Sequence, residues 1–286
     1  MKKLCQFVVP LYGQEPEIIT NSWKELSEFV DILLVVNDGI ERSVEKYAFA
    51  KVTYNIENSI YGAWNLGLEA AKLNNHKTLI ISGNDTYFPI ITAHRFVDRI
   101  GNYGRKAVCA HTYHSFDCTE VVGEQCSLPI FLDKTLKIAN PSFVTGIYFN
   151  CFALNVEWAL DIVGGFDPRY KLYFGDTDFL ITLHKLGFDN TCFQKDLSCL
   201  VYEYWKQGWE TIATQSMDID FLADTFADEA EFFYEKWKDQ WNTIVVNNPF
   251  VDVRSGICNN GRFVGKKALR DLQFDNRSNS RFLASL

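Results

Sequence analysis

The segment D-I-L-L-V-V-N-D-G, residues 31–39, joins a run of apolar residues directly to a polar turn. Such an unbroken apolar run is typical of a strand buried on both faces of a parallel sheet. Its Asn37-Asp38-Gly39 ending is a strong turn signal. The pattern recurs at residues 77–85, where K-T-L-I-I-S is followed by G-N-D. The sequence therefore predicts a sheet of parallel strands that end in polar turns.

Strand and helix patterns alternate on both sides of this segment. Buried strands are predicted at 4–10, 31–36, 51–55, 77–82, 106–111, 144–154, 190–193 and 198–202. Helices are predicted over 15–30, 61–73, 89–100, 155–163, from about 176, and over 215–241, with a hairpin or extended loop at 115–141. This order implies an α/β fold with a mostly parallel central sheet flanked by helices. In such sheets, the loops at the carboxyl ends of the strands form the ligand crevice.

The composition is that of a globular protein. The chain has 286 residues, of which 47% are hydrophobic and 15% aromatic, so it can bury a sizeable core. A net charge of −8 argues against a protein that coats nucleic acid with its whole surface. No apolar run is long enough to cross a bilayer, and the first apolar stretch lacks a small-residue cleavage site. We therefore expect a cytoplasmic protein without a transmembrane segment, with its eight scattered cysteines as reduced core thiols.

Basic residues gather at the C-terminus. From residue 254 onward, seven Lys and Arg residues against two Asp give a charge of +5, which leaves −13 for the rest of the chain. One interpretation is a solvated helix and tail. The other is a contact for a phosphate-bearing or otherwise anionic acceptor.

Three polar clusters lie at the ends of predicted strands or at the start of a helix. Tyr12 and Asp38 could supply a flat wall and a hydrogen-bond acceptor for a nucleoside base, although an ordinary turn explains Asp38 equally well. Asp85 could hold Mg²⁺ or Mn²⁺, with a diphosphate and waters completing the octahedron, or it could belong to a turn or helix cap. Asp176 and Asp178 stand two residues apart at a helix start, where acidic residues are favourable anyway. One of them could serve as a general base.

Five segments, in order and over roughly residues 4–205, resemble family 2 glycosyltransferases of the GT-A fold. V-V-P-L-Y-G at 8–13 is similar to the first strand with its P-x-Y turn, and L-L-V-V-N-D-G at 33–39 to the nucleoside-binding segment. N-S-I-Y-G-A-W-N-L-G at 58–67 resembles a helix start that lies against the nucleotide. I-I-S-G-N-D-T-Y-F at 80–88 resembles a variant of the DXD metal motif. The stretch at 163–188, V-G-G-F-D-P-R-Y…F-G-D-T-D-F…G-F, resembles the G-G-F-D…E-D-x-D signature.

The resemblance implies an inverting enzyme that moves a sugar from a nucleoside-diphosphate sugar donor to a glycan or other hydroxyl acceptor. It implies Asp176 as the catalytic base, and Mn²⁺ or Mg²⁺ held by Asp85, with Glu203 as a substitute second ligand. The implied nucleotide-sugar-binding residues are Pro10, Tyr12, Asp38, Asn65, Asn84 and Asp85, with Asp178 and Trp205 on the acceptor side. We expect a glycosyltransferase domain over 1–214, with a nucleotide-sugar half at 1–112 and an acceptor half at 113–214. A helical C-terminal extension with a basic tail would span 215–286.

The sequence departs from the family pattern at three places. Gly175 replaces the Glu of the E-D pair, Asn37 replaces the first Asp of D-D-G, and Glu203 stands near where a His often completes the metal site. These departures support a second hypothesis, a catalytically degenerate protein that binds a nucleotide-sugar without turnover. A third hypothesis is a transferase whose acceptor is a modified nucleic-acid base, which we favour less than a glycan precursor.

Overall fold

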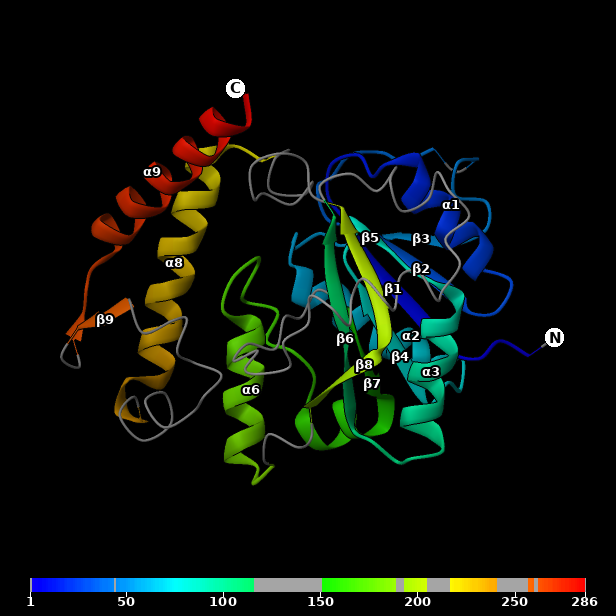
Figure 1. Cartoon of the computed structure of the whole chain (residues 1–286). Coiled ribbons are helices and arrows are strands. Elements are labelled where there is room, and N and C mark those ends of the chain that lie inside the picture. Colours follow the sequence, from blue (N-terminus) through cyan, green and yellow to red (C-terminus); the bar gives the residue numbers. More distant parts are fainter. Residues whose placement is uncertain are drawn as a thin grey trace.

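A computed structural model of the chain describes residues 2–43, 45–115, 151–188, 193–204, 217–240, 257–259 and 262–285. Its centre is an eight-stranded sheet in the order β3-β2-β1-β4-β7-β6-β8-β5 (Figure 1). The parallel part consists of β1 (Gln6–Leu11), β2 (Asp31–Val36), β3 (Lys51–Tyr54) and β4 (Thr78–Ser82). The remaining strands are β5 (Thr86–Tyr87), β6 (Ala107–Ser115), β7 (Cys151–Asn155) and β8 (Phe193–Tyr204). β7 is antiparallel to β4 and β6, whereas β8 is parallel to β6 and antiparallel to β5.

Helices pack on both faces of the sheet, and β1 shows how the side chains divide between them. Phe7 and Val9 point into a core that includes residues of α1 (Glu17–Leu26) and α3 (Ile90–Gly101). Val8 points into a second core, formed with α2 (Ile60–Leu73), the π-helix η1 (Trp158–Val163) and α6 (Gly175–Lys185). Successive side chains of a strand face opposite sides, so a strand buried on both faces must be apolar throughout.

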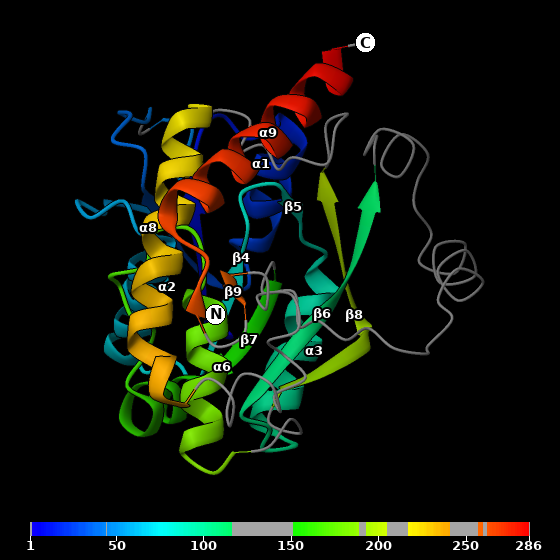
Figure 2. The same cartoon turned by 90° about the vertical axis from the view of Figure 1, so that its left-hand side faces the viewer.

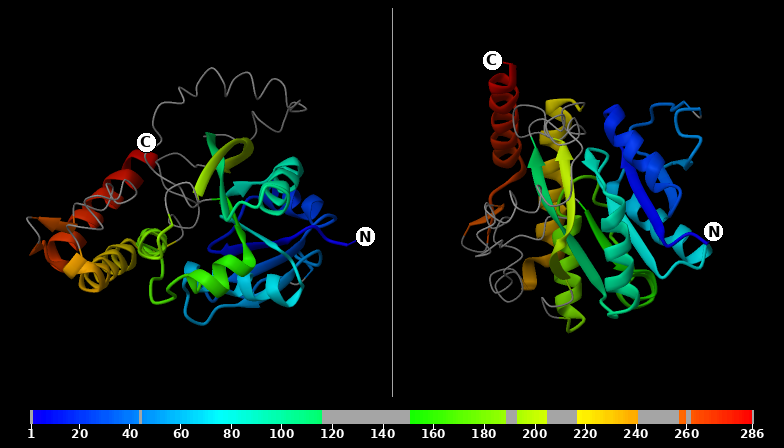
Figure 3. Two further views of the ribbon diagram at one scale, coloured as in Figure 1. Left: turned by 90° about the horizontal axis from the view of Figure 1, so that it is seen from below. Right: turned by 45° about the vertical axis from the view of Figure 1, so that its right-hand side comes forward.

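The C-terminal part adds two helices outside the sheet. α8 (Ile219–Trp237) is followed by the 3-10 turn η3 (Lys238–Gln240), the hairpin of β9 (Cys258–Asn259) and β10 (Arg262–Phe263), and α9 (Lys266–Ser285). α6 lies between α8 and the sheet (Figure 1 and the left view of Figure 3). α9 packs against α8 and crosses it at an angle (Figure 2).

Part of the basic tail is paired with acidic residues of α8. Arg270 binds Asp224 at 2.5 Å and also contacts Asp220, and Lys266 pairs with Asp228. These pairs supply a structural reason for the opposite charges of the two helices. They also reduce the positive charge that Lys266 and Arg270 could offer to an anionic acceptor.

The predicted fold class is confirmed, with three local differences. The strand predicted at 198–202 lies within the longer β8, whose pairing jumps from Ala110↔Asp196 to His111↔Leu200. The strand predicted at 190–193 lies outside the described residues except for Phe193, and the strand predicted at 144–154 lies outside them before Cys151. The helix predicted at 155–163 is largely a π-helix, and the short β5 was not predicted. The loop predicted at 115–141 lies almost entirely outside the described residues. The proposed domain boundary at 214 also lies outside them, so the division into domains stays a prediction.

Two other expectations concern cysteines and membranes. Cys5, Cys109, Cys151 and Cys199 are buried and form no disulfide among the described residues, as predicted for core cysteines. Among the helices described, none combines the length and the apolar character that crossing a membrane requires.

Gly67 allows α2 to lie close to β1. A Cβ built on Gly67 would come within 2.7 Å of the Val8 side chain. We expect Gly67→Ala to lower the free energy of unfolding by about 1–3 kcal/mol through overpacking. Gly101→Ala is the matched control, because Gly101 is also helical and its Cβ would meet nothing within 4 Å. Urea denaturation of both variants checks this prediction, and equal effects would contradict the close contact.

Candidate functional site

The carboxyl ends of β1, β2 and β4 lie at one edge of the sheet, because these strands are parallel neighbours. Hydrogen bonds connect the turns that follow them. The Asn84 side chain donates to the backbone oxygen of Tyr12 at 2.6 Å, and the backbone N–H of Gly13 donates to Asp38 at 2.8 Å. The predicted nucleotide residues Pro10, Tyr12, Asp38, Asn84 and Asp85 are thus brought to the same edge. We call this edge, from the turns at 12–13, 37–38 and 83–85, the donor edge.

Asp38 is engaged by internal donors at this edge. Arg42 donates to its Oδ2 at 2.5 Å, and the backbone N–H of Ile40 donates to its Oδ1 at 3.0 Å. Arg42, which the sequence analysis overlooked, also donates to the backbone oxygen of Gly13 at 2.8 Å. An Arg four residues after an Asp in a turn is the signal that could have indicated this pair. A base N–H would have to share the Asp38 carboxylate with these donors.

Two neighbouring side chains of the donor edge are buried. Tyr12 is almost fully buried, and its hydroxyl donates to the backbone oxygen of Asn58 at 2.7 Å. Asn37 is fully buried, and neither polar atom of its amide has a hydrogen-bond partner in the part of the chain that the structure describes. Buried amides are rarely left unpaired in folded proteins, so this one marks a place where a water or a ligand would complete the bonding.

Asp85 sits in the turn between β4 and β5, mostly buried. Gly83 leaves room beside it, because a Cβ at position 83 would lie 2.6 Å from Asp85 Oδ1. The backbone of Glu203 in β8 pairs with Thr86, directly after Asp85. The side chain of Glu203 lies outside what the structure describes, as does Trp205.

A divalent cation at this place would have few protein ligands. Within the described residues, no three His, Cys, Asp or Glu side chains form a metal cluster. Mg²⁺ commonly uses one or two protein carboxylates together with waters and substrate phosphates. Asp85 provides one such carboxylate, and the backbone of Glu203 lies nearby, so the minimal requirement is met.

The two carboxylates at the start of α6 occupy different environments. Asp176 is half-buried, its Oδ1 accepts from the Thr177 N–H at 2.7 Å, and its Oδ2 has no hydrogen-bond partner among the described residues. Asp178 is buried, and it accepts from Trp237 Nε1 at 2.9 Å and pairs with Lys236 at 2.7 Å. Burial raises the pKa of the Asp178 carboxyl, and the bonds from Lys236 and Trp237 oppose this shift. Asp178 thus joins α6 to α8, and its place on the acceptor side stays a prediction.

Asn65 attaches α2 to the residues that precede α6, and its contact with a nucleotide-sugar stays a prediction. Its side-chain oxygen accepts from the Phe166 N–H at 2.9 Å, and its nitrogen donates to the Phe166 oxygen at 2.8 Å. Earlier in the chain, Ser59 donates to the backbone oxygen of Tyr170 at 2.5 Å. Ser59 caps the start of α2 and Asn65 lies within the helix. Both attach α2 to residues 164–174, which we call the base-bearing loop because α6, with the proposed base Asp176, follows it.

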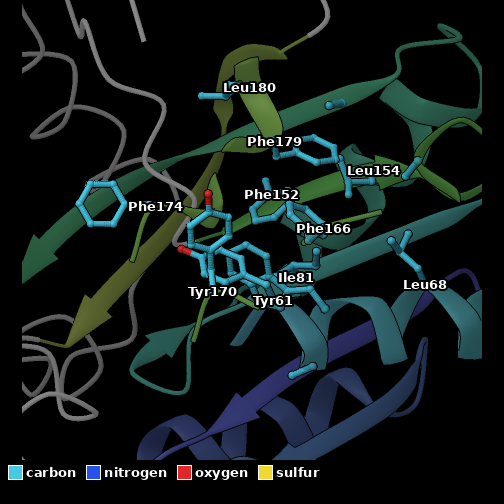
Figure 4. Close-up of a cluster of buried hydrophobic side chains, with 14 of the residues drawn as sticks. Tyr61, Leu68, Ile81, Phe152, Leu154, Phe166, Tyr170, Phe174, Phe179 and Leu180 are labelled. Carbon is cyan, nitrogen blue, oxygen red and sulfur yellow. The ribbon is translucent and has the colours of Figure 1, made fainter. Parts of the chain in front are cut away.

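Gly175 is explained by the packing of Tyr61. A Cβ on Gly175 would lie 2.6 Å from three carbons of the Tyr61 ring. Tyr61 is buried and packs edge-to-face on Trp64, with ring centroids 5.0 Å apart, so it has little freedom to move. Figure 4 shows Tyr61 grouped with Phe166 and Tyr170, and Phe174 at the edge of the group. The glutamate of the family pattern therefore cannot fit here unless Tyr61 moves.

Gly175→Ala should lower the free energy of unfolding by about 1–3 kcal/mol, because the new methyl group overlaps the Tyr61 ring. The same substitution made in a Tyr61→Ala background should cost much less, because the ring is gone. Thermal or urea unfolding of the four proteins of this double-mutant cycle gives the coupling between the two positions. Equal costs in both backgrounds would show that Tyr61 does not exclude a side chain at 175.

Comparison with known proteins gives a structural result only. No protein-family model and no curated protein sequence matches this chain. The crystal structure of S. aureus TarS 1-349 in complex with UDP-GlcNAc is similar, with a TM-score of 0.52 and 14% identity over 98% of this chain and 88% of that chain. Glucosyl-3-phosphoglycerate synthase from Mycobacterium tuberculosis, in complex with phosphoglyceric acid, gives a TM-score of 0.48 and 13% identity over 77% of this chain and 75% of that chain. The chain thus has the GT-A fold that its sequence predicted.

Proposed function

We propose that this protein is an inverting glycosyltransferase, which moves a sugar from a nucleoside-diphosphate sugar to an acceptor hydroxyl. The observation that carries the proposal is the environment of Asp176. It is the half-buried carboxylate at the start of α6, with one oxygen not engaged by any described residue, whereas Asp178 is fully used by internal donors. A general base must be able to reach the proton that it takes, and Asp176 alone of the pair meets this condition.

The donor edge supports a nucleotide-sugar as the donor. Parallel α/β sheets bind ligands at the carboxyl ends of their strands, where Tyr12, Asp38 and Asn84 lie. The unpaired buried amide of Asn37 is a further polar group that a ligand or water at this edge would satisfy. The similar TarS structure contains UDP-GlcNAc, so a uridine donor is the first to test.

In the proposed reaction, Asp176 takes the proton of the acceptor hydroxyl while the hydroxyl oxygen attacks C1 of the sugar. The bond between C1 and the diphosphate breaks on the opposite side, which inverts the anomeric centre. Asp85 and Glu203 would hold Mn²⁺ or Mg²⁺, which when bound neutralises charge on the departing diphosphate. Bringing donor and acceptor into line contributes at least as much as either group.

The degenerate-binder hypothesis rests mainly on the missing glutamate at position 175. The ring of Tyr61 fills the space that this side chain would need, which indicates a repacked site and leaves Asp176 in place. We therefore keep the catalytic proposal. A nucleic-acid base as acceptor is disfavoured further by the ion pairs of Lys266 and Arg270 with α8, because these cations are partly neutralised.

The proposal is tested by incubating the purified protein with a panel of nucleotide-sugars and Mn²⁺, and by measuring release of nucleoside diphosphate. The panel includes UDP-GlcNAc and is repeated with glycan precursors and other hydroxyl acceptors. Turnover of one donor is expected. Donor binding without release under any acceptor would favour the degenerate binder instead.

Asp176→Asn should reduce kcat by about 10²–10⁴-fold, since an amide cannot accept the hydroxyl proton. The KM for the donor should change little, because the proposed base contacts the acceptor. Asp178→Asn, two residues along α6, is the contrast: it should lower the free energy of unfolding by about 1–3 kcal/mol by weakening the contacts with Lys236 and Trp237. Steady-state kinetics and urea unfolding of both variants separate the two roles. Retention of full activity by Asp176→Asn excludes it as the base.

Asp85→Asn should weaken the binding of the divalent cation on which turnover depends, because an amide is a poorer ligand than a carboxylate. The wild-type enzyme should lose activity when EDTA removes the metal and recover it with Mn²⁺, whereas Asp85→Asn should need much higher Mn²⁺ concentrations. Titration of Mn²⁺ against the rate of diphosphate release in both proteins provides the measurement. An unchanged Mn²⁺ requirement in the variant would place the metal elsewhere.

A further inference from the structure

A buried glutamate of α8 binds the base-bearing loop. The Glu229 carboxylate accepts hydrogen bonds from three consecutive backbone N–H groups: Lys171 at 2.5 Å, Leu172 at 3.2 Å and Tyr173 at 2.6 Å. Its side chain is almost fully buried. Successive backbone N–H groups that point to one place form a concave anion-binding site, and here that site is filled by the protein's own carboxylate. The bonds end three residues before Asp176.

The same face of α8 also holds the next residue of the loop. Phe174 has a positive φ of 61°, a left-handed conformation that is unfavourable for a bulky residue. Its buried ring packs against Phe226 and Phe233, with centroid distances of 5.3 Å and 5.2 Å. Phe226, Glu229 and Phe233 are three and four residues apart, so they lie on one side of the helix. A strained backbone of this kind persists only where its surroundings hold it.

We propose that Glu229 is a positioning residue for catalysis, whose ionised carboxylate holds residues 171–174 in the conformation that places Asp176 at the start of α6. The inference rests on the proposed function, because it assumes that Asp176 is the base. It assigns a role to the C-terminal extension: α8 fixes the loop from outside the sheet. Glu229 itself does not touch the reacting atoms.

We expect the rate of turnover to fall on the acidic side of its pH profile, and we call this fall the acid limb. Burial raises the pKa of Glu229 to about 7, although the bonds from the backbone of Tyr173, Lys171 and Leu172 oppose the shift. When the carboxyl is protonated, one of its oxygens carries a hydrogen that conflicts with the N–H donors around it. The loop is then held less firmly, so kcat should fall as the pH drops through about 7.

Stability should respond to pH in the opposite direction. The pKa of Glu229 is raised in the folded protein, so its contribution to stability is fully present below the ordinary pKa of the group and is lost as the pH rises through about 7. Activity and the Glu229 contribution to stability therefore have opposite pH trends. A residue that only stabilised the fold in its ionised form would not produce this combination.

Other titratable groups lie near this carboxylate. Lys171 belongs to the loop itself, Tyr12 approaches from the end of β1, and Tyr173 follows in the loop, where Arg277 of α9 contacts it. Burial raises the pKa of both Tyr12 and Tyr173, which takes them further from neutral pH. The pKa of the Glu229 carboxyl, in contrast, is raised to about 7.

The test compares Glu229→Gln with Glu235→Gln. A glutamine at this position mimics the protonated carboxyl at every pH. Its NH₂ group carries hydrogens that face the backbone N–H groups of residues 171–173, which are also donors. Glu235 is on the same helix but exposed, and it pairs only with Lys238 among the described residues. With the donor found in the panel, Glu229→Gln should lower kcat at pH 8 by roughly tenfold or more, with the donor KM within about twofold. It should also remove the acid limb near pH 7, and Glu235→Gln should behave as wild type.

Hydrogen exchange of the amides of residues 171–173 supplies a readout that does not depend on turnover. Protection factors in the wild type should rise as the pH increases through about 7, and this rise should be absent in Glu229→Gln. An unchanged kcat and acid limb in Glu229→Gln would overturn the proposal, as would pH-independent protection in the wild type. If the wild type turns over no donor yet shows the rise in protection, the proposed function fails while the attachment of the loop by Glu229 stands.

Discussion

The base-bearing loop is held from two sides, and the site depends on this double attachment. On one side, Asn65 and Ser59 of α2 bind the backbone of Phe166 and Tyr170. On the other side, α8 binds the loop through the Glu229 carboxylate and the rings that enclose Phe174. α2 is itself set close to β1, where a Cβ at position 67 would crowd Val8. A continuous series of close contacts thus runs from β1, through α2 and the loop, to the C-terminal extension.

This arrangement suits a reaction in which two substrates must meet in line. Misplacement of a catalytic group by about 1 Å can cost as much as 10²-fold in rate, so a base needs a rigid support. The proposed base, Asp176, has such support because α6 begins directly after a strained residue that its neighbours hold. The same packing explains why the family glutamate is absent, since Tyr61 occupies its space. The absence of this acidic residue is therefore compatible with the proposed catalytic site.

The sequence predicted the parallel core and the donor edge well, because both depend on local patterns. Continuous apolar runs that end in N-D-G and G-N-D turns are sufficient to place Asp38 and Asp85 at one edge of the sheet. The roles of Asn65 and Asp178 could not be foreseen, because each depends on a partner more than 50 residues away: Phe166 for Asn65, and Lys236 and Trp237 for Asp178. Glu229 was missed for the same reason. Its only local signal is an acidic residue between two phenylalanines on an apolar helix face.

We expect the donor edge to bind a nucleotide, with a divalent cation on Asp85. Calorimetric titration of the wild-type protein with UDP and other nucleoside diphosphates, with and without Mn²⁺, measures this binding. Saturable binding of one nucleoside diphosphate at a single site, strengthened by Mn²⁺, is the expected result. Absence of binding for every nucleoside diphosphate, in the presence of Mn²⁺ and with the protein folded, would exclude a nucleotide site at this edge.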